Sequence, residues 1–160
     1  MKQISLLIMS LSISFCAFSN DTVKNCRDYY YGVCLNETAI EDFNEYLELH
    51  KDYNDAVIKG YQSIIWFLWA DYYINPIQKW KCFKKGKDEL DQLINANSEN
   101  TELRFLRLTI QDNVPGFLGY SDNKEEDRKF IYNQLDKISD KDLHKKIVNY
   151  LCYNSMAKIK

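Results

Sequence analysis

The feature that most constrains the fold is the apolar stretch at residues 54–74, NDAVIKGYQSIIWFLWADYYI. Its central run, GYQSIIWFLWA, carries no charge and has half the length of a membrane span, which needs about 20 residues. Projected at about 100° per residue, its apolar side chains cover most of the circumference of a helix. We therefore expect a helix that ends before Pro76 and lies at the centre of a helical bundle.

The remainder of the chain also has the pattern of helices. It contains two prolines and five glycines, and no segment alternates strictly between apolar and polar residues. Helical spacing of apolar residues predicts six helices, over about residues 37–52, 54–74, 76–96, 100–113, 124–138 and 140–155. The expected fold class is all-α, a compact bundle of about six antiparallel helices whose successive pairs can stack in a repeat-like manner. In the third helix we expect Ile77, Trp80, Phe83 and Leu90 to face inward.

The N-terminal residues MKQISLLIMSLSISFCAFS, 1–19, have the parts of a secretory signal peptide: one lysine, an apolar run, and the small residues Ala17 and Ser19. This pattern predicts cleavage after Ser19 and export to the periplasm or the medium. After cleavage we expect no membrane span. The predicted organisation is a signal peptide at 1–19, a cysteine-bearing segment at 20–36 and one helical domain at 37–160.

Four cysteines follow the leader, at Cys26, Cys34, Cys82 and Cys152. In an exported chain an even number of cysteines indicates disulfides before metal binding. The short spacing of the first two, with Gly32 as a turn residue, favours a local Cys26–Cys34 disulfide. The other two then bridge helices or remain buried thiols. Four cysteines permit three pairings, and the sequence leaves them open.

Residues suited to catalysis or metal binding are scarce. The two histidines, His50 and His144, belong to no cluster with the spacing of metal ligands. The acidic stretch SDNKEEDRK, 121–129, lacks the alternate carboxylates of a calcium loop, and its acids fit the start of a helix. We expect no catalytic residue, no metal and no cofactor, which favours a non-enzymatic role. A net charge of −2 without a basic block argues against nucleic-acid binding.

One unusual pattern lies in TELRFLRLTIQDNVPGFLGY, residues 101–120, where apolar residues surround charged ones. On a helix, Arg104, Arg107 and Gln111 fall within about 60° of one another. A buried arginine needs an acidic partner, because an unpaired buried charge is costly. The first interpretation is therefore a structural ion pair of these arginines with Asp71, or with Glu102 or Glu99 as local alternatives.

The second interpretation is a binding site for a small anion. The guanidinium groups of Arg104 and Arg107, with Gln111 and Tyr120, would hold a carboxylate or phosphate near the 115–120 loop. If the arginines are buried and paired, this interpretation loses its support.

The segment ELRFLRLTIQDNVPGFLGYSDNKEEDRKFI, residues 102–131, resembles a recurrent segment of small exported, all-helical bacterial proteins. In that uncharacterised family an acid-x-Arg-Phe-Leu-Arg helix runs into Gln-x-Asn-x-Pro-x-Phe-Leu-Gly-Tyr. The resemblance covers about residues 57–150 and implies a helical exported domain but no activity. It also implies that nine residues act as a unit: Glu102, Arg104, Arg107, Gln111, Asn113, Pro115, Leu118, Gly119 and Tyr120.

Taken together, these patterns predict a non-catalytic interaction module in the envelope or outside the cell. The expected partner is another exported or envelope protein. Aromatic surface from residues 29–31 or 61–80 would make the contact, because tyrosine provides contact area at a small entropic cost. The alternative is the small anionic ligand at Arg104, Arg107 and Gln111.

Overall fold

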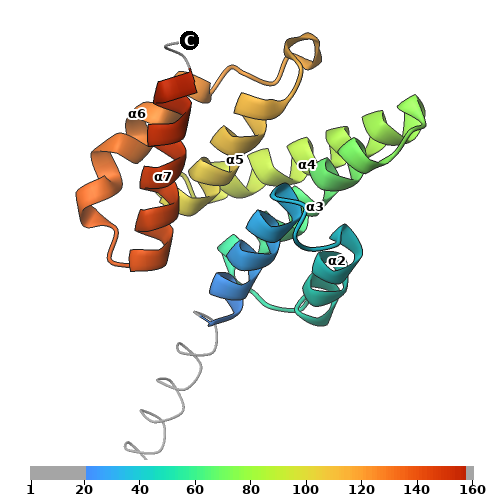
Figure 1. Ribbon diagram of the computed structural model, residues 1–160, viewed down its shortest axis with the longest axis horizontal. Coiled ribbons are helices and arrows are strands. Elements are labelled where there is room, and N and C mark those ends of the chain that lie inside the picture. Colours follow the sequence, from blue (N-terminus) through green and yellow to red (C-terminus); the bar gives the residue numbers. More distant parts are fainter. Residues whose placement is uncertain (1–20, 158–160) are drawn as a thin grey trace, which may run out of the picture. The chain divides into compact units, whose positions relative to one another are not determined.

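The computed structural model describes residues 21–157 and, over that range, contains seven α-helices and two short 3-10 helices. The first helix covers residues 21–34. It is followed by α2 (Ile40–Leu49), α3 (Ala56–Tyr72), α4 (Pro76–Ala96), α5 (Thr101–Asn113), η1 (Gly116–Leu118), α6 (Lys124–Gln134), η2 (Leu135–Lys137) and α7 (Lys141–Ala157) (Figure 1). The predicted all-α helical bundle is confirmed, with one helix more than expected. The predicted signal peptide, residues 1–19, lies outside the described residues.

The additional helix, residues 21–34, occupies the segment in which the sequence predicted a disulfide. Cys26 and Cys34 lie about two turns apart on this helix, which separates them by about 12 Å along its axis. The Cα atoms of a disulfide are at most about 7 Å apart, so the predicted Cys26–Cys34 disulfide is wrong. Cys82 and Cys152 also carry free thiols, so the predicted disulfide character is not found among the four described cysteines.

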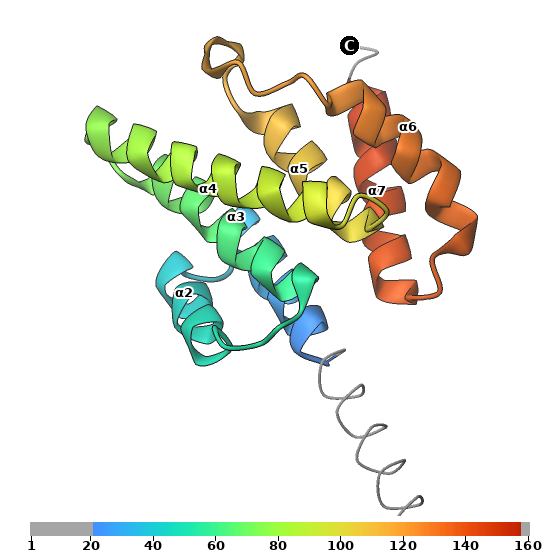
Figure 2. The ribbon, with the colours of Figure 1, turned by 180° about the vertical axis from the view of Figure 1, so that it is seen from behind.

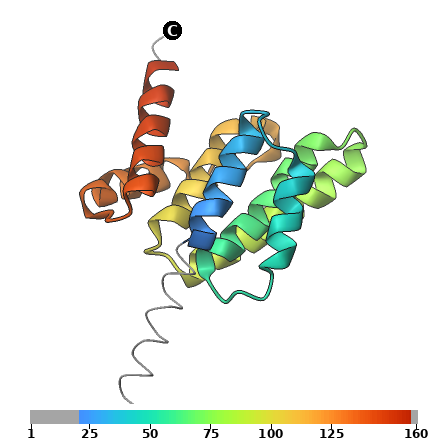
Figure 3. The same ribbon diagram turned by 60° about the horizontal axis from the view of Figure 1, so that its bottom comes forward.

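The chain divides into two compact units, Met1–Lys87 and Asp88–Lys160. In the first unit α2 packs against α3 (Figure 3). The Asp55 carboxylate caps α3 by accepting hydrogen bonds from the backbone N–H groups of Val57 and Ile58, at 2.8 and 3.1 Å. The core of this unit includes Phe43, Leu47, Ile58, Tyr61, Ile64 and Phe67.

A close approach joins α3 to the first part of α4. A Cβ atom on Gly86 would lie 2.8 Å from the Phe67 ring and 3.0 Å from the Ser63 carbonyl oxygen, so only glycine lets the two backbones come this near. The buried side of this part of α4 therefore includes Phe83 and Gly86. Ile77 and Trp80, which we expected to face inward, are exposed instead.

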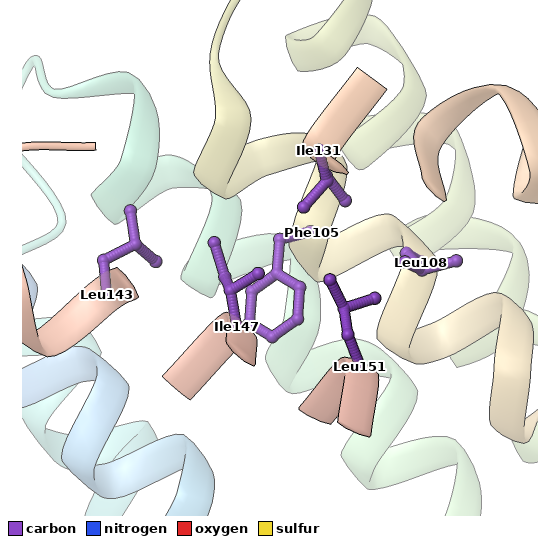
Figure 4. Close-up of a cluster of buried hydrophobic side chains, with 6 residues drawn as sticks. All are labelled: Phe105, Leu108, Ile131, Leu143, Ile147 and Leu151. Carbon is purple, nitrogen blue, oxygen red and sulfur yellow. The ribbon is translucent and has the colours of Figure 1, made fainter. Parts of the chain in front are cut away.

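The second unit contains α5, α6 and α7, drawn from yellow to red in Figure 2, and α5 packs against α6. Its core combines side chains from all three helices (Figure 4): Phe105, Leu108, Ile131, Leu143, Ile147 and Leu151. Among the residues that the structure describes, no helix has both the length and the apolar character to cross a bilayer.

Candidate functional site

The candidate site lies in the second unit, where α5 carries the two arginines. The Asn100 side chain caps this helix by accepting a hydrogen bond from the backbone N–H of Leu103, at 3.0 Å. Every residue from Glu102 to Gln111 is buried. Arg104 and Arg107 therefore need internal partners, because each guanidinium group has lost most of its contact with water.

Asp127, in the first turn of α6, is the central partner of both arginines. Its side chain is fully buried. Its Oδ1 accepts hydrogen bonds from Arg104 Nη1 and Arg107 Nη2, both at 2.9 Å, and its Oδ2 accepts one from Arg107 Nε at 2.7 Å. Arg107 thus grips the carboxylate with two parallel N–H groups, the strongest geometry for this pair.

Further acceptors complete the shell around Arg104. Its Nη1 also donates to Glu126 Oε1 at 3.0 Å, and its Nε donates to the carbonyl oxygen of Ser98 at 2.7 Å. The guanidinium carbon lies 4.3 Å from the centre of the Phe130 ring, a cation–π contact. The Nε and Nη1 groups of Arg104 are thus engaged by acceptors of the chain itself.

Asp91, on α4 within the second unit, links Arg107 to Tyr120. Its Oδ1 lies 3.4 Å from Arg107 Nη1 and accepts a hydrogen bond from the Tyr120 hydroxyl at 2.9 Å. We call Arg104, Arg107, Asp91, Tyr120, Glu126 and Asp127 the arginine–aspartate cluster. It sets three carboxylates against two guanidinium groups, so its formal charge is negative and does not attract an anion.

The same contacts shift the pKa values of Arg107 and Tyr120. Burial alone would lower the pKa of Arg107, but the hydrogen bond and charge of Asp127 raise it above the usual range. Burial and the neighbouring Asp91 carboxylate raise the pKa of Tyr120 far above that of an ordinary phenol. Tyr120 is therefore a neutral hydrogen-bond donor and does not supply a phenolate base.

A second charged group, which the sequence did not reveal, surrounds Asp112 on α5. Its carboxylate accepts hydrogen bonds from Arg128 Nη2 at 3.0 and 3.1 Å and from the Tyr150 hydroxyl at 3.0 Å, and it pairs with Lys124 Nζ at 2.7 Å. Burial acts to raise the pKa of Asp112, but these donors outweigh it and lower the pKa below the usual range. The group connects α5, α6 and α7.

The other predicted site residues lie elsewhere. Asp71 is exposed at the end of α3, and Glu102 is buried, but the acids that contact the two arginines are Asp127, Glu126 and Asp91. The ion pairs described for the two arginines are thus with acids from α4 and α6, which the sequence did not single out. Helical spacing in the sequence could have indicated that Asp127 is buried, because Asp127 precedes Ile131 by one helical turn and so lies on the same face, and Ile131 is buried.

Gln111 shares the buried face of α5 with the arginines but takes no part in their hydrogen bonds. Both the nitrogen and the oxygen of its amide are buried and have no hydrogen-bond partner in the described structure. A buried amide without a partner reduces stability. Gln111 is the one polar side chain of the predicted anion site that is not satisfied internally.

No group of three or more histidine, cysteine or acidic side chains suited to hold a metal ion occurs in the described part of the chain. The Nδ1 atom of His50 lies 2.8 Å from the Tyr46 carbonyl oxygen. A shallow hollow on the first unit is lined by Tyr29, Asp42, Glu45, Tyr46 and Leu49.

Comparison of the chain with models of protein families, with curated proteins and with solved structures found no match. The resemblance to the family of exported helical proteins thus stays a prediction.

Proposed function

We propose that the chain is a non-catalytic interaction module of the envelope or the extracellular space, and that it binds an exported protein with a basic surface. The observation that carries this proposal is the internal neutralisation of Arg104 and Arg107 by Asp127. Because these guanidinium groups are already engaged, the alternative of a small anionic ligand loses the groups that would bind it. An interaction surface must then lie on another part of the chain.

The first unit offers such a surface in a row of neighbouring rings. Tyr29 stacks on Tyr46 with ring centres 4.9 Å apart, Tyr46 lies 4.3 Å from His50, and His50 lies 5.2 Å from Tyr53. All four residues are half-buried, so each keeps part of its surface exposed. We call these four residues the aromatic row. Because these ring contacts, stacked, tilted and edge to face in turn, already order the side chains, a partner that covers them loses little side-chain entropy.

The charge beside the aromatic row favours a basic partner. The helix α2, IEDFNEYLEL, carries four acids and no basic residue. Asp42 and Glu45 are exposed and line the hollow together with Tyr29, Tyr46 and Leu49. Aromatic residues at the centre of a contact with charged residues at its rim are typical of protein interfaces. A lysine or arginine from the partner fits the acidic rim.

Site-specific photo-crosslinking in the producing cell tests this proposal. We expect benzoylphenylalanine at position 49, where Leu49 is exposed on the rim, to give one discrete protein adduct. The same group at position 117, in the second unit, is the matched control, because Phe117 is also exposed. Combining position 49 with Asp42→Lys and Glu45→Lys should reduce the adduct at least roughly tenfold, since charge repulsion weakens the encounter.

Two outcomes would contradict the proposal. One is the absence of any adduct at position 49, and the other is equal adducts at positions 49 and 117. A small molecule that copurifies with the chain and is lost in Arg107→Ala would instead support the anionic-ligand alternative.

A further inference from the structure

The connection between α3 and α4 carries a set of exposed apolar side chains that the aromatic row does not include. Tyr72, Ile74, Ile77 and Trp80 are 62%, 95%, 65% and 53% exposed. We call these four residues the apolar tip. The connection lies at one end of the α3–α4 pair, in green in Figures 1 and 2. Neighbouring apolar residues exposed in this way mark a surface that contacts another molecule or a membrane.

Contacts inside the first unit fix the conformation of the chain around the apolar tip. Trp69 stacks on Tyr73 with ring centres 5.8 Å apart and contacts Tyr72 edge to face at 5.3 Å. Trp80 stacks on the buried Phe83 at 6.0 Å. The Asn75 side chain accepts a hydrogen bond from the backbone N–H of Ile77 at 2.9 Å and so caps α4. The tip is therefore an ordered surface.

Lysines follow the apolar tip directly along α4. Between Asp71 and Asp88 the chain contains five lysines and no acid, although its net charge is −2. Lys81, Lys84 and Lys85 are exposed and lie within about 80° of Ile77 around the helix axis, and Lys85 Nζ also lies 3.7 Å from the centre of the Trp66 ring. They follow Ile77 by about 6–12 Å along the axis. One exposed face of α4 thus begins with apolar side chains and continues with basic ones.

This order of side chains matches the layers of a lipid bilayer surface. Isoleucine is suited to the acyl region, tryptophan and tyrosine to the boundary, and lysine to the headgroups, which it reaches with a long apolar stem. An amphipathic element at such an interface enters it by about 5–10 Å, comparable with the spacing from Ile77 to the lysines. Contact of the tip with a second copy of itself is disfavoured, because the two lysine clusters would repel each other.

We propose that the apolar tip inserts into the surface of an anionic lipid bilayer, while the lysines of α4 bind the headgroups. This attachment uses a different surface from the aromatic row and does not depend on the proposed protein partner. Asp71, exposed at the end of α3, and Asp88, exposed on the same face of α4 beyond the lysines, both reduce the attraction of this surface for anionic lipid.

Vesicle co-sedimentation tests this proposal with the full chain as it is recovered from the producing cell, with the same N-terminus in every variant. We expect at least roughly tenfold tighter binding to phosphatidylcholine vesicles with about 30 mol % phosphatidylglycerol than to phosphatidylcholine alone. Binding should weaken in about 0.5 M salt, where screening shortens the reach of the lysines.

Two double variants separate the apolar and the charged contributions. Ile74→Asp with Ile77→Asp, and Lys81→Glu with Lys84→Glu, should each reduce binding to the anionic vesicles at least roughly tenfold. The matched control is Leu49→Asp, because Leu49 is 75% exposed in the same unit but outside the tip. It should bind like the unchanged chain. Circular dichroism of each variant verifies that the helices are retained.

Three results would overturn the lipid assignment. The first is no binding of the unchanged chain to anionic vesicles, and the second is equal binding of the chain and its tip variants. The third is retention of the chain by an envelope protein, dependent on Ile74 and Ile77, without binding to vesicles, which would make the tip a protein-docking surface.

Discussion

Asp127 is the residue on which the second unit depends most, because one fully buried carboxylate serves two guanidinium groups. We expect Asp127→Asn to lower the free energy of unfolding by about 3–5 kcal/mol, since it removes the fully buried carboxylate that both arginines share and leaves them only the more exposed Glu126 and Asp91. Urea denaturation measures this loss. The control is Asp122→Asn, because Asp122 is exposed in the loop before α6. A loss of the same size in the control would contradict the assigned role of Asp127.

Gln111 gives the opposite expectation at the same scale. Gln111→Met keeps the approximate shape of the side chain and removes a buried amide that has no hydrogen-bond partner. The free energy of unfolding should therefore rise by about 1 kcal/mol, as measured by urea denaturation. Gln62→Met is the control, because the Gln62 amide donates to the His50 carbonyl oxygen and its removal should give no such gain. A lower stability of Gln111→Met would contradict the absence of a stabilising contact at this amide.

Prediction from sequence succeeded in part for these residues. Helical spacing placed Arg104, Arg107 and Gln111 on one face, and the cost of a buried charge required acidic partners. The partners themselves were missed, since Asp127 lies in an acidic stretch that reads equally well as the solvated start of a helix. Helical spacing orders residues within one element, whereas the choice among distant acids depends on how the elements pack.

At the scale of elements, the contact between α3 and α4 leaves no room for a side chain at Gly86. In an exposed helix, alanine is favoured over glycine by about 1 kcal/mol. Here the added methyl group meets the buried Phe67 ring and a backbone carbonyl, so Gly86→Ala should lower the free energy of unfolding by about 1–3 kcal/mol. Gly116→Ala is the control for thermal or urea denaturation, because no atom lies within 4 Å of a Cβ atom there.

The control should change stability by at most about 0.5 kcal/mol. A Gly86→Ala variant as stable as the unchanged chain would mean that α3 and α4 are farther apart than described.

Asp112 makes the packing of α5, α6 and α7 dependent on pH. Its pKa is lowered in the folded protein, so its contribution is present above the pKa of an unfolded aspartate, about 3.9. That contribution is lost as the pH falls from there through the lower pKa of the folded state. Urea midpoints between about pH 2 and pH 6 should decline less steeply in Asp112→Asn. Asp136→Asn, at an exposed aspartate, should keep the steeper decline.

The helices themselves were largely predictable. Those expected at about 76–96 and 100–113 correspond to α4 and α5, because proline and asparagine mark their starts and apolar spacing marks their lengths. The helix at residues 21–34 was missed, since two closely spaced cysteines in an exported chain favoured a disulfide. Ile77 and Trp80 were assigned to the wrong face, because apolar character predicts burial and does not distinguish a core from an exposed contact surface.

At the scale of the whole molecule, the four described cysteines change the expected chemistry of the chain. None forms a disulfide, and Cys26 is fully buried whereas Cys152 is exposed. Alkylation without reductant, followed by mass spectrometry, should label Cys152 much faster than Cys26 in the folded protein. All four should react once the chain is unfolded. A mass deficit that matches a disulfide, in the unfolded and alkylated chain, would contradict this expectation.

The division into two units was not predictable from the sequence. It falls at Lys87 and Asp88, inside α4, where no run of proline, glycine or serine marks a linker. Composition identifies flexible boundaries, but a boundary within a continuous helix has the same local pattern as the rest of that helix.

The arrangement in which Asp127 serves both Arg104 and Arg107 also bears on how this chain can change over generations. Replacing Asp127 removes the carboxylate that the two arginines share, and replacing either arginine removes some of the hydrogen bonds of Asp127, so each single replacement passes through a less stable protein. A neutral version of the cluster requires coordinated replacements on α5 and α6, whereas the exposed surfaces can vary one position at a time. We therefore expect the residues at these three positions to be retained together in related chains, while the proposed binding surfaces of the first unit diverge.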